Sequence, residues 1–104
     1  NYKLWKKYYS GATGLLSIVI KSKKKSSVIK FVNSLELFGI GYSWGGFESL
    51  AILQELRSNK KDEYLQGRKF FRFDKDEHIV RLHIGLEDPK DLINDLKRSL
   101  GYIK

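Results

Sequence analysis

Hydrophobic positions in the first part of the chain predict a strand followed by a helix. The run Leu15 to Ile20 is rich in aliphatic and β-branched residues, which favours a buried strand. Ser26 or Ser27 is expected to cap the following helix, and Gly39 to end it in the left-handed conformation. Apolar residues at helical spacing would form the buried stripe of that helix: Val28, Phe31, Val32, Leu35 and Phe38.

A second strand and helix are expected near the C-terminus. Residues 79–84 alternate cleanly, so their side chains should point to two different faces. One face would carry Val80, Leu82 and Ile84, and the other Ile79, Arg81 and His83. Asp88 would cap the helix that follows, with Pro89 at its first position, and Gly101 would end it. The apolar stripe of this helix would be Leu92, Ile93, Leu96 and Leu100.

The middle of the chain is less regular. Residues 38–47 are the most glycine-rich stretch, with Tyr42 and Trp44 among the glycines, so backbone could approach another strand or a ligand closely there. Residues 49–57 have helical propensity but could begin as a strand, and residues 59–76 read as a long charged loop with a short extended piece. The order of elements predicts a single two-layer α+β domain over residues 1–104, with a small, mainly antiparallel sheet covered on one face by helices.

Composition removes several function classes. The 104 residues include no cysteine, which excludes disulfides, thiolate zinc sites and cysteine nucleophiles, and fits a reducing cytoplasm. No apolar stretch approaches the roughly 18 residues of a transmembrane helix. The two histidines, His78 and His83, would lie on opposite faces of a strand, so no metal site is expected. The sequence contains no methionine and begins with Asn1. Removal of an initiator methionine normally needs a small second residue, and asparagine is not small, so the chain is expected to be a piece of a longer protein.

Charge raises one alternative function. Twenty Lys and Arg against twelve Asp and Glu give a net charge of +8, a balance typical of proteins that bind nucleic acid. The densest basic cluster, however, lies between a predicted strand and a predicted helix, without interleaved aromatic residues, and is expected to be a solvated loop. Its members are Lys21, Lys23, Lys24 and Lys25. A small basic nucleic-acid-binding domain is therefore kept as an alternative.

Arg81 is the strongest candidate for chemistry. It lies in an otherwise apolar strand, on the face opposite the predicted core, where a guanidinium could grip a carboxylate or phosphate through two parallel hydrogen bonds. The alternative is that it reaches solvent or pairs with an acidic neighbour.

The carboxylate pairs give no sign of a shared pocket, and surface or capping roles are expected for Glu36 with Glu48 and Glu87 with Asp88.

Three segments, in order along the chain, resemble the pyridoxal-phosphate (PLP) enzymes of cysteine and methionine metabolism. Residues 43–49 are similar to that family's serine–x–glycine–glycine–x–glutamate–serine motif, and residues 81–88 with 91–96 to its closing signature. Residues 4–17 resemble its tract leading into the C-terminal domain. The resemblance implies the C-terminal domain of a fold-type I PLP enzyme. The tryptophan after the motif serine, Trp44, resembles the residue that cystathionine β-lyases carry at this position. Those enzymes cleave cystathionine to homocysteine, pyruvate and ammonia.

By this resemblance, Arg81 binds the α-carboxylate of the substrate cystathionine, and Ser43 and Trp44 line the same pocket. The resemblance places the PLP lysine, the ring-stacking aromatic and the pyridine-nitrogen aspartate in a large domain, so no catalytic, cofactor or metal residue is expected here. It implies a cytoplasmic homotetramer, inactivity of this chain alone, and no nucleic acid or membrane partner. The match fades between Leu50 and Ile79, where residues 60–72 are basic.

Two further alternatives stay open. The chain could belong to a γ-acting member of the same family, a cystathionine γ-synthase or γ-lyase, because the β-lyase assignment depends mainly on Trp44 and its neighbour Tyr42. It could also persist naturally without a large domain, as a remnant that only binds other molecules.

Overall fold

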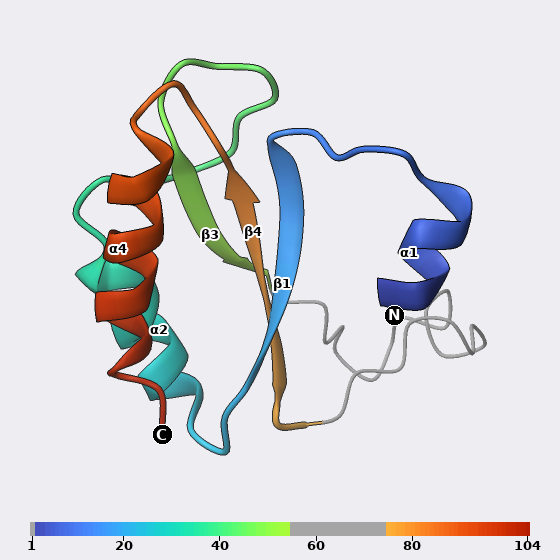
Figure 1. The fold of residues 1–104 in the computed structure, drawn as a ribbon. Coiled ribbons are helices and arrows are strands. Elements are labelled where there is room, and N and C mark those ends of the chain that lie inside the picture. The colour runs from blue at the N-terminus through green and yellow to red at the C-terminus, as the bar shows by residue number, and fades with distance from the viewer. Residues whose placement is uncertain (1, 55–74) are drawn as a thin grey trace, which may run out of the picture.

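The computed structural model describes residues 2–54 and 75–104, which form one four-stranded sheet and three helices (Figure 1). The sheet order is β1-β4-β3-β2. The strands are β1 (Leu15–Lys21), β2 (Gly39–Ile40), β3 (Leu50–Gln54) and β4 (Glu77–His83). The helices are α1 (Tyr2–Tyr8), α2 (Lys25–Ser34) and α4 (Pro89–Leu100). None of these helices is long and apolar enough to cross a membrane.

The sheet is mixed, which corrects the expectation of a mainly antiparallel sheet. β4 pairs antiparallel with both β1 and β3, but β2 pairs parallel with β3. The reason lies in residues 41–49, called here the 41–49 loop. This loop carries the chain from the end of β2 back to the start of β3, so both strands run in the same direction.

Helices α2 and α4 lie on the same side of the sheet, as Figure 1 shows, and the core fills the space between the two layers. The alternation expected for β4 is confirmed, because Val80 and Leu82 are buried against the helices. The core side chains are Ile20, Val28, Phe31, Val32, Leu35, Phe38, Ala51, Val80, Leu82 and Leu92. The two-layer α+β arrangement is therefore confirmed. Helix α1, which the pattern did not predict, has no buried residue.

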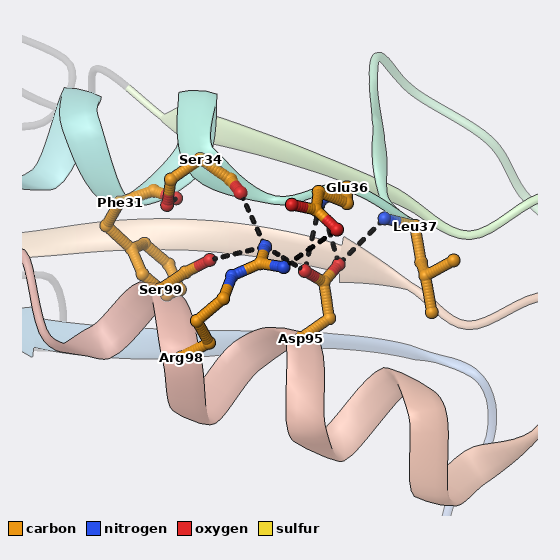
Figure 2. A network of polar contacts seen from close by, with 7 residues as sticks. All are labelled: Phe31, Ser34, Glu36, Leu37, Asp95, Arg98 and Ser99. Atoms are coloured by element: carbon orange, nitrogen blue, oxygen red, sulfur yellow. Dashed lines mark hydrogen bonds and ion pairs between the residues drawn. The ribbon is translucent and has the colours of Figure 1, made fainter.

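Helix α2 differs from its prediction at both ends. The N-cap residue is Lys24 rather than a serine, and its backbone N–H donates to Ser22 Oγ over 3.2 Å. The helix ends at Ser34, because Leu35 turns extended and the next two backbone N–H groups donate to the carboxylate of Asp95 (Figure 2). Gly39 is therefore not a left-handed cap but the first residue of β2.

Helix α4 begins as predicted. Asp88 accepts a hydrogen bond from the backbone N–H of Lys90 over 2.8 Å, Pro89 stands in the first turn, and Gly101 follows the last helical residue. The predicted stripe is only half right. Leu92 is buried and Leu96 packs against the core, whereas Ile93 and Leu100 are exposed. Asp95 and Ser99 are buried in their place, because the helix presents polar side chains to the end of α2.

The two middle predictions have different outcomes. The stretch 49–57 was expected either to be helical or to begin as a strand, and it begins as the strand β3. Its last three residues, and nearly all of the loop expected over 59–76, lie outside the described residues. The lysines at 23–25 are exposed, in agreement with the solvated position expected for the basic cluster.

Candidate functional site

Arg81 lies in the central strand β4, on the sheet face away from α2 and α4. Its direct neighbours across the sheet are Ser17 on β1 and Ile52 on β3, so it is flanked by strands on both sides. This position follows from the alternation of β4, because the residues on either side of Arg81 point into the core on the other face. The expectation that Arg81 points away from the core is confirmed.

The guanidinium of Arg81 is oriented by two contacts. Its Nη2 donates a hydrogen bond to the carbonyl oxygen of Ser43 over 3.1 Å, and its Cζ lies 5.0 Å from the centre of the Tyr42 ring. The Tyr42 hydroxyl in turn accepts a hydrogen bond from Gln54 Nε2 over 3.1 Å. Among the described residues, no carboxylate forms an ion pair with Arg81. The expected alternative, pairing with an acidic neighbour, is therefore not found in this part of the chain.

Ser43 and Trp44 have different surroundings, although they are adjacent in the 41–49 loop. The Ser43 carbonyl faces Arg81, and its Oγ packs so closely on Gly46 that a β-carbon there would come within 2.6 Å. The side chain of Trp44 is 87% exposed. Gly45 has a φ of +87°, a conformation that other residues rarely adopt. The fold brings Ser43 to Arg81 and leaves Trp44 open to solvent.

A hydrogen-bond network fixes the far end of the 41–49 loop to the segment after β4. Glu87 accepts from the Ser49 backbone N–H over 2.9 Å and from the Ser49 hydroxyl over 2.7 Å. The Ser49 oxygen accepts from the Gly85 N–H over 2.8 Å. The Ser49 backbone N–H, followed by its hydroxyl, lowers the pKa of Glu87 below its ordinary value.

The acidic residues singled out from the sequence thus separate into distinct roles. Asp88 caps α4 as expected, and Glu36 pairs with Arg98 at the surface. Glu87 was expected to have a surface or capping role, and its anchoring of the 41–49 loop was missed. The available signal was that Ser49 and Glu87 belong to the two motifs quoted above, although 38 positions separate them.

The two histidines lie on opposite faces of the sheet, as their spacing predicted. His78 Nε2 is 3.0 Å from the carbonyl oxygen of Ser22, and His83 Nε2 is 2.9 Å from that of Gly46. Within the described ranges, no three His, Cys, Asp or Glu side chains form a group that could hold a metal ion.

The arrangement around Arg81 suits a small anion. A guanidinium fixed on a rigid strand, with a ring against one side, can present its remaining N–H groups to a planar carboxylate. Every lysine in the described residues is exposed, so this part of the chain encloses no amine beside that cation. The site therefore presents a guanidinium that no described carboxylate pairs with, and no enclosed lysine beside it.

Comparison with known proteins gives a consistent family. Residues 1–101 match the family described as "Cys/Met metabolism PLP-dependent enzyme". A cystathionine beta-lyase from Bordetella avium is 42% identical over 99 residues, 95% of this chain and 23% of the relative. An L-alanine/L-glutamate racemase from Wolbachia pipientis wMel is 36% identical over 103 residues, 98% and 24% respectively. A cystathionine gamma-lyase from Macaca fascicularis is 35% identical over 103 residues, 95% and 24%. The chain spans about a quarter of the length of these curated relatives.

Proposed function

Since the chain belongs to the Cys/Met metabolism family of PLP-dependent enzymes, we propose that it is the substrate-carboxylate-binding domain of a carbon–sulfur lyase. In this proposal, Arg81 binds the α-carboxylate of an amino-acid substrate. Ser43 and Trp44 complete the same pocket. The substrate is cystathionine, which a β-lyase cleaves to homocysteine, pyruvate and ammonia.

The observation that carries the proposal is that the Arg81 guanidinium is held in place but has no carboxylate partner among the described residues. Its guanidinium is held by the Ser43 carbonyl and the Tyr42 ring, yet no described carboxylate neutralises it. A partly buried cation oriented in this way favours a bidentate carboxylate ligand. Fixing that carboxylate would orient the rest of the amino acid, and positioning of this kind can supply several kcal/mol of barrier lowering.

The described residues alone do not fit the cofactor. PLP binds covalently to a lysine amine, and the lysines in this part of the chain are all exposed. When bound, PLP would withdraw electrons from the bonds of the substrate that are broken. We place the residues that hold it in a large domain, in the three quarters of the relatives' length that this chain does not cover. On its own, the chain would hold a substrate carboxylate without performing the reaction.

Trp44 is assigned to the pocket by the motif, and its exposure supports a partner outside the described residues. An indole that is 87% exposed on this chain is free to pack against a substrate or against the large domain.

The complete enzyme is proposed to be a cytoplasmic homotetramer. Sedimentation of the complete protein would test this, and a monomer would overturn it.

The test uses the protein encoded by the complete natural reading frame, purified with PLP. A visible absorption band of bound PLP and release of pyruvate from cystathionine are expected. Arg81→Lys should raise KM for cystathionine about 100-fold, because an ammonium cannot form the paired hydrogen bonds of a guanidinium. Arg98→Lys is the matched control. It makes the same chemical change in α4, on the other side of the sheet, and should leave KM unchanged.

Other outcomes overturn defined parts of the proposal. Release of 2-oxobutyrate and cysteine would indicate γ-cleavage, the activity named for the Macaca relative. Interconversion of alanine or glutamate enantiomers without pyruvate would indicate a racemase, as named for the Wolbachia relative. A reading frame without a large domain would remove the enzymatic assignment altogether. Tight nucleic-acid binding that falls steeply with salt would favour the basic-domain alternative.

A further inference from the structure

His83 combines burial, a hydrogen bond to the 41–49 loop and an unpaired nitrogen. The residue is 5% exposed, and its Nε2 lies 2.9 Å from the carbonyl oxygen of Gly46. In the part of the chain that the structure describes, His83 Nδ1 is the only buried side-chain nitrogen or oxygen without a hydrogen-bond partner. The proposed function gives no role to this side chain.

The contact with Gly46 determines which ring nitrogen carries a proton. A carbonyl oxygen only accepts, so Nε2 must donate its hydrogen. Nδ1 then stays unpaired whether it is protonated or not. Burying an unpaired polar atom costs stability, so an apolar side chain would suit a position that served packing alone. The bond from Nε2 is therefore the feature that a histidine adds at this point of β4.

That bond holds a residue of the loop that packs against Ser43, a contact of Arg81. Gly46 lies against Ser43 Oγ, and the Ser43 carbonyl accepts the hydrogen bond from Arg81. The Ser49–Glu87 contacts hold the far end of the loop, three residues further along the chain. His83 and Arg81 are two residues apart on β4, so both point to the same sheet face. One strand thus holds the guanidinium and the loop that orients it.

We propose that His83 is a positioning residue that fixes the 41–49 loop through the Gly46 carbonyl and so keeps the Ser43 carbonyl against Arg81. Its effect on substrate binding rests on the function proposed above, whereas its effect on the loop does not. Without this bond, the loop would separate more often from the end of β4, and the Arg81 side chain would lose one of its two orienting contacts.

Three substitutions test the proposal in the complete protein. His83→Leu removes the donor and fills the volume with an apolar side chain. His83→Gln places an amide near the position of Nε2 and should partly restore the bond, whereas the shorter amide of His83→Asn should not. His78→Leu is the matched control, because His78 makes the same kind of contact, from Nε2 to a backbone carbonyl, on the same strand but the opposite face.

Loop anchoring is measured by hydrogen exchange at the backbone amides of Ser49, Gly85 and Leu86, whose bonds join the loop to the segment after β4. His83→Leu and His83→Asn should speed exchange there about 5- to 10-fold, and KM should rise by a similar factor with kcat within about 2-fold. His83→Gln should lie nearer the wild type, and His78→Leu should leave all three amides and KM unchanged.

The two readouts separate failure of this proposal from failure of the proposed function. If the complete protein lacks lyase activity but His83→Leu still speeds exchange at the three amides, the loop anchor holds and the substrate assignment is wrong. Unchanged exchange in His83→Leu would overturn the anchor. If His83→Leu speeds exchange throughout the domain and His83→Gln speeds it equally, His83 has a purely structural role. That result would also overturn the proposed anchor.

Discussion

Two polar networks of this domain use the same chemistry for different ends. In each, one carboxylate accepts hydrogen bonds from the backbone of a distant segment: Asp95 holds the chain after α2, and Glu87 holds the 41–49 loop. Figure 2 shows the first network, in which Arg98 contacts Asp95, Glu36 and the Ser34 carbonyl. That cation is matched by two carboxylates.

Arg81 beside the second network is different. It contacts a carbonyl and an aromatic ring, and no described carboxylate balances its charge. Both carboxylates around Arg98 belong to the fold itself, whereas the charge of Arg81 is left for the substrate carboxylate proposed above. In this domain, the two arginines differ in how many carboxylates surround them, and it is this difference that makes Arg81 rather than Arg98 the candidate binding group.

The largest expected effect on stability is at Asp95. Asp95→Ala should cost about 3 kcal/mol of unfolding free energy, because the backbone N–H groups of Glu36 and Leu37 lose a buried carboxylate as their acceptor. Asp95→Asn keeps one oxygen and should cost about half as much. Urea denaturation measures both. A change in substrate KM in Asp95→Asn would contradict the separation between the two networks.

Gly85→Ala is expected to have the next largest effect. A β-carbon at Gly85 would come within 2.7 Å of the carbonyl carbon of Glu48, a backbone atom that can move only with the 41–49 loop. We expect a cost of about 2 kcal/mol and a clear rise in KM, since overpacking displaces the loop. Thermal unfolding and steady-state kinetics measure the two effects. Gly11→Ala, where a β-carbon meets nothing within 4 Å, is the control.

Glu87→Gln should have a smaller effect that depends on pH. Because the folded pKa of Glu87 lies below its ordinary value of 4.5, its ionised form stabilises the folded state above that pH, and this contribution is lost as the pH falls through the folded pKa. The difference in unfolding free energy between Glu87→Gln and the wild type should be about 1 kcal/mol near pH 7 and shrink in acid. Urea denaturation across a pH series measures it, and a constant difference would contradict the assignment.

The smallest stability change is expected at Trp44. Because its side chain is 87% exposed, Trp44→Ala should leave the unfolding free energy within about 0.5 kcal/mol of the wild type. In the complete enzyme it should nonetheless raise KM for cystathionine if Trp44 lines the pocket. Leu86→Ala, at 86% exposure, is the control and should change neither quantity. Equal kinetics in the two variants would remove Trp44 from the site.

Local patterns of the sequence determined much of this domain. The alternation of β4 placed Arg81 opposite the core, and the Asp88–Pro89 pair marked the start of α4. These features depend on side-chain period and on hydrogen bonds between near neighbours, which the order of residues specifies directly. The three collinear motifs also identified the family, which the match over residues 1–101 confirms.

Only the tertiary structure decided where α2 ends, which stripe of α4 is buried and how the 41–49 loop is held. Asp95 stops α2 by accepting from the backbone of Glu36, 59 positions away, and Glu87 reaches Ser49 across 38 positions. The parallel pairing of β2 likewise depends on how the chain returns to β3. A helical pattern that continues to Phe38 cannot reveal such contacts, because their free energy comes from groups that meet only after the layers have packed.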